Sequence, residues 1–293
     1  MRKIIKAITR RIRRLDSIDE RLERVQEALG RVEARQTSSA LDLRSAEFRT
    51  FSQWGEDGII QALIRNVSIE RNIFIEFGVQ DYSESNTRFL LLNNNWSGLV
   101  IDGDAGNIDA IKRSDLYWRH NLKAECAFIT RENINDIFVG AGVQGDIGLL
   151  SIDIDGNDYW VWEAINAVSP RIVTVEYNFR FGAADAVAIP YRADFNRARA
   201  HRSMIYYGAS LAALALLAAR KGYDLVGCNS AGNNAFFVRR DVRPAALPAV
   251  TAAEAFVEGR FREARGADGG LLFLSVEEER GILKNLPLNW IDA

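Results

Sequence analysis

The chain of 293 residues has little cysteine, little histidine and no long apolar run. Its two cysteines, Cys126 and Cys228, are too few for a disulfide framework or a cysteine-rich zinc site, and they favour a reducing, cytoplasmic setting. The formal net charge of −2 gives the whole chain no bulk attraction for nucleic acid. The longest apolar stretch, Leu211 to Ala219, is far shorter than the roughly 20 residues that span a bilayer. The sequence therefore predicts a globular protein that neither crosses a membrane nor binds nucleic acid.

Acidic side chains are absent from the first 14 residues, which are rich in arginine and lysine. In and after this segment, apolar residues recur at the spacings of three and four that are typical of a coiled coil, with one interruption at Arg11. These residues are Ile4, Ile8, Leu15, Ile18, Leu22, Val25, Leu29 and Val32. We expect residues 1–36 to form a basic amphipathic helix that joins copies of the chain into a homo-oligomer, and residues 37–45 to form a linker. Two interpretations of the basic end remain: peripheral contact with anionic lipid at the inner face of a membrane, or a solvated coiled-coil end.

Between residues 46 and 240, short apolar runs alternate with segments of helical spacing. The runs predicted as strands are Ile73–Phe77, Gly98–Asp102, Glu125–Ile129, Ile147–Ile154, Ile172–Tyr177, Asp224–Cys228 and Ala235–Arg239. Such alternation is typical of a parallel, doubly wound sheet, and the short gap between the last two runs suits a hairpin. We therefore predict an α/β fold with a seven-stranded, mostly parallel sheet and one antiparallel edge strand. This resembles the Rossmann-like architecture of class I S-adenosylmethionine-dependent methyltransferases. Residues 241–293 are predicted to form a helical extension.

The first two predicted strands end in residues that suit a nucleoside cofactor. Ligands of doubly wound sheets bind beyond the carboxyl ends of the strands, where Glu76 and Gly78 follow the first strand. The glycine permits a sharp turn and a close approach to a ligand, while the missing Gly-x-Gly-x-x-Gly pattern argues against a dinucleotide. The acid before the glycine suits a cofactor with a cationic amino-acid end. Asp102, at the end of the second strand, is placed to accept both ribose hydroxyls of an adenosine.

The densest group of acids follows the fourth and fifth predicted strands. Asp153 and Asp155 alternate with isoleucines, which predicts that both point to the same side of an extended segment. With Glu176 and Asn178 they form an all-oxygen set suited to Mg²⁺ or Mn²⁺. The alternative is that these side chains bind loop amides and shape the pocket without a metal. His201, in a polar and aromatic stretch after the fifth strand, is the candidate general base, with a surface or supporting position as its alternative.

Several motifs, in this order along the chain, resemble those of the FkbM-type methyltransferase family. They are Phe51-Ser-Gln-Trp-Gly-Glu-Asp-Gly58, Phe74-Ile-Glu-Phe-Gly78, Ser85-Asn-Thr87, Asn95-Trp-Ser-Gly-Leu-Val-Ile-Asp102 and Leu150-Ser-Ile-Asp-Ile-Asp-Gly156. The resemblance covers about residues 51–240 and implies S-adenosylmethionine as methyl donor. The cofactor-binding residues that it implies are Glu76, Gly78, Asn86, Asp102 and Asp153, with Gln53 and Asp57 near the methionine end. Val79-Gln-Asp after Gly78, and Asp155 where the family more often has glutamate, depart from the family pattern. The Asp155-Gly-Asn-Asp158 segment suggests a subgroup with a different acceptor.

Together these features predict an enzyme that methylates a hydroxyl of a sugar or glycan, such as a surface polysaccharide or its precursor. Asp153, Asp155 and His201 are its expected catalytic residues, with or without a metal ion. Most of the rate enhancement would come from holding donor and acceptor in reactive geometry, with proton removal adding a smaller factor. The alternative to an enzyme is a non-catalytic scaffold, in which a coiled coil carries a nucleoside-binding Rossmann-like domain.

Overall fold

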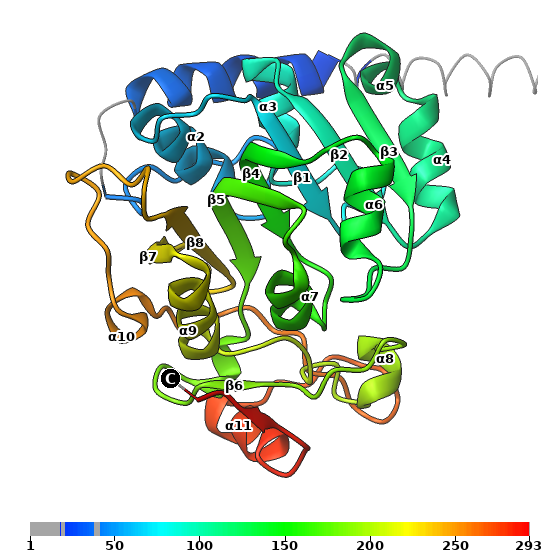
Figure 1. Cartoon of the computed structure of the whole chain (residues 1–293). Coiled ribbons are helices and arrows are strands. Elements are labelled where there is room, and N and C mark those ends of the chain that lie inside the picture. Colours follow the sequence, from blue (N-terminus) through cyan, green and yellow to red (C-terminus); the bar gives the residue numbers. More distant parts are fainter. Residues whose placement is uncertain (1–17, 19–20, 38–41, 293) are drawn as a thin grey trace, which may run out of the picture.

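The computed structural model describes residues 18, 21–37 and 42–292. A seven-stranded sheet forms its centre, in the order β3-β2-β1-β4-β5-β8-β7 (Figure 1). The strands are β1 (Ile73–Phe77), β2 (Ser97–Asp102), β3 (Leu122–Cys126), β4 (Gly145–Ile152), β5 (Val168–Glu176), β7 (Tyr223–Cys228) and β8 (Asn234–Arg239). The first five are mutually parallel, and β1 pairs with β2 on one side and with β4 on the other. The direction of winding therefore reverses between β1 and β4, which is where such sheets bind ligands.

The antiparallel strand is β8, and it lies inside the sheet instead of at its edge. It pairs antiparallel with both β5 and β7, so β7 is the edge strand. The prediction of an antiparallel edge strand is therefore wrong, and burial gives the reason. Asn234 to Val238 of β8 are all buried, whereas β7 keeps half-buried residues such as Asp224 and Gly227. The hairpin folds back so that its more apolar strand takes the inner place. The predicted α/β class and the seven-stranded, mostly parallel sheet are otherwise confirmed.

Helices cover both faces of the sheet. One face packs against α2 (Glu56–Asn66), α3 (Arg88–Asn94) and α4 (Ala105–Arg113), which the short α5 (Asp115–Arg119) follows. The other face packs against α6 (Ile134–Gly140), α7 (Asp158–Ala164) and α9 (Leu211–Lys221). Each layer buries a continuous apolar cluster against the sheet, with Phe74 and Trp162 among its largest buried side chains. Because both faces of the sheet are buried by helices, the ends of the strands are held in place. The loops that follow these strand ends are held in place with them.

A smaller layer lies beyond the ends toward which β4 and β5 point (Figure 1). Its elements are η1 (Phe179–Phe181), β6 (Val187–Ala188), α8 (Arg197–Ala200), α11 (Val276–Leu283) and β9 (Asn289–Trp290). The short α10 (Ala252–Ala255) lies outside this layer, against α9 and β7. The prediction of a helical extension at 241–293 is largely wrong, because only the short α10 and α11 are helical and β9 instead pairs with β6. The side chain of Arg180 anchors the layer: it is fully buried and lies 2.6 Å from Glu279 and 3.1 Å from Glu263.

The N-terminal segment forms a helix over residues 21–36, which packs against the domain through Ala34 and the ring cluster of Phe48, Phe51 and Phe89. The predicted seam residues Ile4, Ile8 and Leu15, and with them the basic end, lie outside the described residues. Within the described ranges, no helix combines the length and the apolar character needed to cross a membrane.

Candidate functional site

Two adjoining cavities open at the switch point between β1 and β4. The smaller, of about 110 Å³, lies against the loop that follows β1, and the larger, of about 530 Å³, extends from the ends of β2 and β3 to the insertion around α8. Gln53, Gly78, Gln80 and Asp153 line both cavities. Because the two cavities share walls, a molecule held in one lies beside a molecule held in the other.

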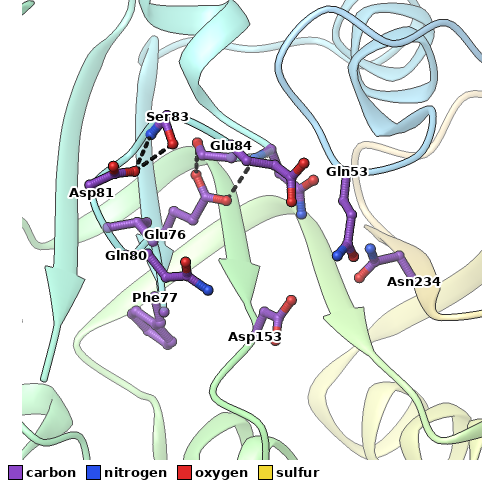
Figure 2. A pocket seen from close by; sticks show the side chains of 13 residues that line it. Gln53, Glu76, Phe77, Gln80, Asp81, Ser83, Glu84, Asp153 and Asn234 are labelled. Atoms are coloured by element: carbon purple, nitrogen blue, oxygen red, sulfur yellow. Dashed lines mark hydrogen bonds between the residues drawn. The ribbon is translucent and has the colours of Figure 1, made fainter. Parts of the chain in front are cut away.

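Glu76 organises the smaller cavity (Figure 2). Its buried carboxylate accepts hydrogen bonds from the amides of Asn86 (2.8 Å) and Thr87 (3.0 Å) and from the hydroxyls of Ser85 (2.8 Å) and Thr87 (2.5 Å). Burial raises the pKa of Glu76, and the four hydrogen bonds counteract part of this rise by favouring the ionised form. Glu76 therefore fixes the Ser85-Asn86-Thr87 turn and still lines the cavity.

Asn86 lines the smaller cavity and Asp102 lines the larger one. The side-chain amide of Asn86 donates to the hydroxyl of Ser151 (3.1 Å), which ties the start of α3 to β4. Asp102 accepts from the backbone amides of Gln80 (2.8 Å) and Asp104 (2.8 Å), so it supports the loop after β1 from the neighbouring strand. Sequence reasoning did not identify Gln80, whose backbone φ of 48° is unusual for a residue other than glycine.

Gly78 is required by contact between the loops that follow β1 and β4. Its φ is +68°, and a Cβ atom at this position would lie 1.9 Å from the carbonyl oxygen of Asp153. A side chain at residue 78 would push the two loops apart. The close approach therefore fixes Asp153 beside the turn of the smaller cavity.

Asp57 does not line either cavity. One of its carboxylate oxygens accepts from the amides of Thr50, Phe51 and Ser52, at 2.7 to 2.8 Å, and from the Ser52 hydroxyl at 3.0 Å. Burial raises the pKa of Asp57 to about 6. The predicted cofactor contact at Asp57 is thus corrected: the residue shapes the segment that presents Gln53, and Gln53 itself reaches both cavities.

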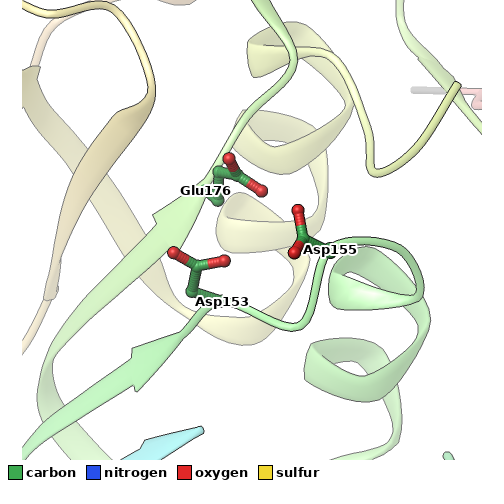
Figure 3. A group of neighbouring side chains, drawn as sticks. All are labelled: Asp153, Asp155 and Glu176. Carbon is green, nitrogen blue, oxygen red and sulfur yellow. The ribbon is translucent and has the colours of Figure 1, made fainter. Parts of the chain in front are cut away.

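Three carboxylates converge in the larger cavity (Figure 3). Oxygen atoms of Asp153, Asp155 and Glu176 all lie within 4.8 Å of one another. Asp153 and Asp155 do not follow an extended strand as predicted, because β4 ends at Ile152 and Asp155 adopts a φ of 53°. The chain turns there because the carboxylate of Asp158 accepts from the amides of Ile154 and Gly156, both at 2.9 Å.

The electrostatics of this cluster call for positive charge or for hydrogen-bond donors. Burial and the neighbouring carboxylates of Asp155 and Asp158 raise the pKa of Asp153 well above its usual value. Burial and Asp153 do the same for the pKa of Glu176. One oxygen of Glu176 is buried without a hydrogen-bond partner among the described residues. Such an oxygen is costly to bury unless a ligand completes its coordination.

Two predicted site residues lie apart from this cluster. The amide group of Asn178 is fully buried and donates to the carbonyls of Ile205 (2.9 Å) and Tyr207 (3.1 Å), while its oxygen accepts from the amide of Arg180. It therefore organises the chain after β5 and is not a metal ligand. His201 lines neither cavity, and its Nδ1 lies 2.6 Å from the hydroxyl of Ser203. The geometry does not place His201 as a general base.

The structure adds a cation that sequence reasoning missed. Arg197 of α8 lies 2.5 Å from Asp155 and 2.9 Å from Glu263, and its guanidinium stacks on the ring of Tyr207. Tyr207 also donates a hydrogen bond to Glu263. Arg197 thus neutralises part of the acidic wall, while Glu176 remains outside this ion pair. No spacing in the sequence signals this arrangement, since its members come from three separate segments: Asp155 after β4, Arg197 and Tyr207 before α9, and Glu263 after α10.

No protein-family model matches the chain, and no curated protein matches it in sequence. Among solved structures, the N-terminal domain of EvdMO1 with SAH bound gives a TM-score of 0.41 at 10% identity, over 72% of this chain and 94% of that one. An S-adenosylmethionine-dependent methyltransferase from Clostridium acetobutylicum ATCC 824 gives 0.38 at 9% identity, over 62% and 89%. An O-methyltransferase from Bacillus cereus in complex with SAH gives 0.37 at 12% identity, over 70% and 87%. These likenesses are too distant to assign a substrate or a site residue to this chain.

Proposed function

We propose that the protein is an S-adenosylmethionine-dependent O-methyltransferase of the FkbM type that acts on a hydroxyl of a sugar or glycan. The observation that carries the proposal is the pair of adjoining cavities with Asp153 in their shared wall. The smaller cavity suits the methionine end of the donor, the larger one suits the adenosine of the donor together with the acceptor, and the carboxylate of Asp153 lies between them.

The charge of the smaller cavity favours a cationic donor. Of the described residues that line it, four are acids and none is lysine or arginine; the acids are Glu76, Asp81, Glu84 and Asp153. Such a wall attracts the ammonium and sulfonium groups of S-adenosylmethionine and repels the pyrophosphate of a dinucleotide. The adenosine then extends into the larger cavity, toward Asp102 and the exposed ring of Phe128.

Methyl transfer mainly requires that the acceptor oxygen is aligned with the methyl group of the donor. The acceptor oxygen attacks the methyl carbon, the carbon–sulfur bond breaks as the carbon–oxygen bond forms, and S-adenosylhomocysteine leaves. The hydroxyl proton passes to the carboxylate of Asp153. Holding the two reactants in line supplies most of the acceleration, and proton removal adds roughly 10²- to 10⁴-fold.

The larger cavity suits a neutral, hydroxyl-rich acceptor. Of the described residues that line it, five are acids and one is a basic residue, Arg197; the acids are Asp102, Asp153, Asp155, Glu176 and Glu263. The side-chain amides of Asn157 and Asn196 and the ring of Phe195 complete a wall of the kind that binds the polar edges and apolar faces of sugars.

The same carboxylates fit a divalent cation. Asp153, Asp155 and Glu176 would hold it, and the unpartnered oxygen of Glu176 is the donor that most needs such a ligand. Bound there, Mg²⁺ or Mn²⁺ would orient an acceptor hydroxyl and lower its pKa. We expect Glu176→Gln to weaken Mn²⁺ binding at least tenfold in calorimetry, whereas Glu163→Gln, at an exposed acid of α7, leaves it unchanged. Equal affinity for both variants would argue that the cluster binds no metal.

The donor is tested by calorimetric titration of the full chain with S-adenosylhomocysteine, with NAD as the comparison ligand. We expect micromolar binding of S-adenosylhomocysteine, at least tenfold weaker in Asp102→Ala and unchanged in Asp109→Ala, at an exposed acid of α4. Absence of binding to the wild-type chain would overturn the proposal. Transfer of a labelled methyl group is then measured to neutral glycans and to matched uronic-acid glycans, with the neutral series expected to react faster.

A further inference from the structure

The helix over residues 21–36 leaves an apolar seam uncovered, and residue 18 continues it. Five side chains that follow the spacing of a coiled coil are each 43 to 60% exposed: Ile18, Leu22, Val25, Leu29 and Val32. They make up five of the twelve large apolar side chains that are exposed among the described residues. A continuous stripe of this kind on a folded surface indicates an interaction site.

The opposite side of the helix already belongs to the domain. Gly30 packs so closely that a Cβ atom there would lie 2.2 Å from the hydroxyl of Thr50 and 2.9 Å from the ring of Phe89. Glu23 pairs with Arg88 of α3, and the side chain of Gln26 donates to the carbonyl of Thr50. At 3.6 residues per turn these contacts and the seam are centred about 130° apart on the helix. The helix (blue in Figure 1) therefore lies along α3 with its seam directed away from the domain.

We propose that the seam binds the same seam of a second copy of this chain, in parallel orientation. The heptad spacing makes the surface self-complementary, which is the requirement for a symmetric pair. Its two flanks differ in charge: Arg21 and Arg35 lie on one side, and Glu33 lies on the other. In a parallel pair unlike flanks meet, whereas in an antiparallel pair arginine faces arginine.

Docking on the domain also makes a short seam sufficient. Two heptads are marginal for an isolated coiled coil, because ordering the helix opposes association. Here the contacts of Gly30, Ala34 and Glu23 have already fixed the helix on its own domain. Pairing then only has to bury side chains that are already in place.

The test is the mass of the full chain in solution, measured by light scattering across a range of concentrations. We expect a dimer for the wild type and a monomer for Leu22→Glu/Leu29→Glu, which places charges on the seam. The matched control, Arg24→Glu/Arg31→Glu, has the same spacing on the solvent-facing side of the helix and is expected to stay dimeric. Because Leu22 and Leu29 are each 60% exposed, the seam variant should fold, and its circular dichroism spectrum should match that of the wild-type chain. Its thermal unfolding should remain a cooperative transition.

A wild-type monomer, or a seam variant that remains dimeric, would overturn the proposal. A monomer that binds phosphatidylglycerol vesicles through the seam would overturn it in favour of a lipid surface. Orientation is tested by Val32→Cys in a Cys126→Ser background, since residue 32 meets its own copy only in a parallel pair. Oxidation to a disulfide-linked dimer supports the parallel arrangement, and a dimer that fails to cross-link contradicts it.

Discussion

Replacing Gly78 by alanine tests the contact on which the two-cavity arrangement depends. Gly78 has a φ of +68°, where an alanine costs about 1–2 kcal/mol. Its Cβ atom would lie 1.9 Å from the carbonyl oxygen of Asp153, so the loops after β1 and β4 must separate by roughly 1.4 Å to restore an ordinary carbon–oxygen contact. Overpacking of this kind adds about 1–3 kcal/mol. We expect Gly78→Ala to lower the free energy of unfolding by about 2–5 kcal/mol.

The same displacement moves walls of both cavities, so S-adenosylhomocysteine should bind at least tenfold more weakly to Gly78→Ala. The control is Gly103→Ala, in the neighbouring turn that lines the larger cavity. A Cβ atom at residue 103 would come no closer than 3.7 Å to the ring of Phe128, which is ordinary contact. Denaturant unfolding and calorimetry of the two variants give both quantities. If Gly78→Ala were to unfold and bind like the wild type, the reasoning from loop contact would be refuted.

Two further predictions concern buried charge. Because burial raises the pKa of Asp57 from 3.8 to about 6, its protonation stabilises the folded state below pH 3.8, and this stabilisation is lost as the pH rises through 6. The wild-type unfolding free energy, relative to that of Asp57→Asn, should therefore fall by about 2 kcal/mol as the pH rises from about 4 to 7, whereas a pH-independent difference would contradict the assignment. Arg180→Met removes the cation that pairs with the buried Glu279, while Glu263 keeps its ion pair with Arg197. This variant should lose about 3–5 kcal/mol of stability and become susceptible to proteolysis beyond residue 240, unlike the exposed control Arg260→Met.

The sequence predicted best those features that depend on a single strand, namely where the strand lies and which residues stand at its end. The predicted apolar runs overlap all seven strands of the central sheet, and β1 was predicted with the bounds Ile73–Phe77 that it has in the structure. The third run, Glu125–Ile129, was placed three residues too late, because β3 spans Leu122–Cys126. Glu76, Gly78 and Asp102 line the cavities, because strand ends in such a sheet share one edge, and their binding of a cofactor stays a prediction. The fourth strand was less well predicted, since the side-chain caps of Asp158 turn the chain two residues earlier than the alternation of apolar and acidic residues suggests.

Residues whose side chains bind loop groups were predicted less well. Asp57 and Asn178 have the chemistry of ligands, but both are used to bind backbone groups of adjacent loops, and no spacing distinguishes the two uses. His201 attracted attention because the chain has only two histidines, yet its scarcity says nothing about where its ring points.

Arg197 shows why compensation of charge is harder to predict than charge itself. Asp153, Asp155 and Asp158 stand within six residues, so the sequence alone says that some positive or hydrogen-bonding partner must be close. That partner can come from any segment that the fold brings near. Here it comes from Arg197, 42 residues beyond Asp155, and its second carboxylate, Glu263, comes from the C-terminal layer. The C-terminal residues therefore complete the acceptor wall, and a domain cut at residue 240 would lose the group that holds Arg197 against the site.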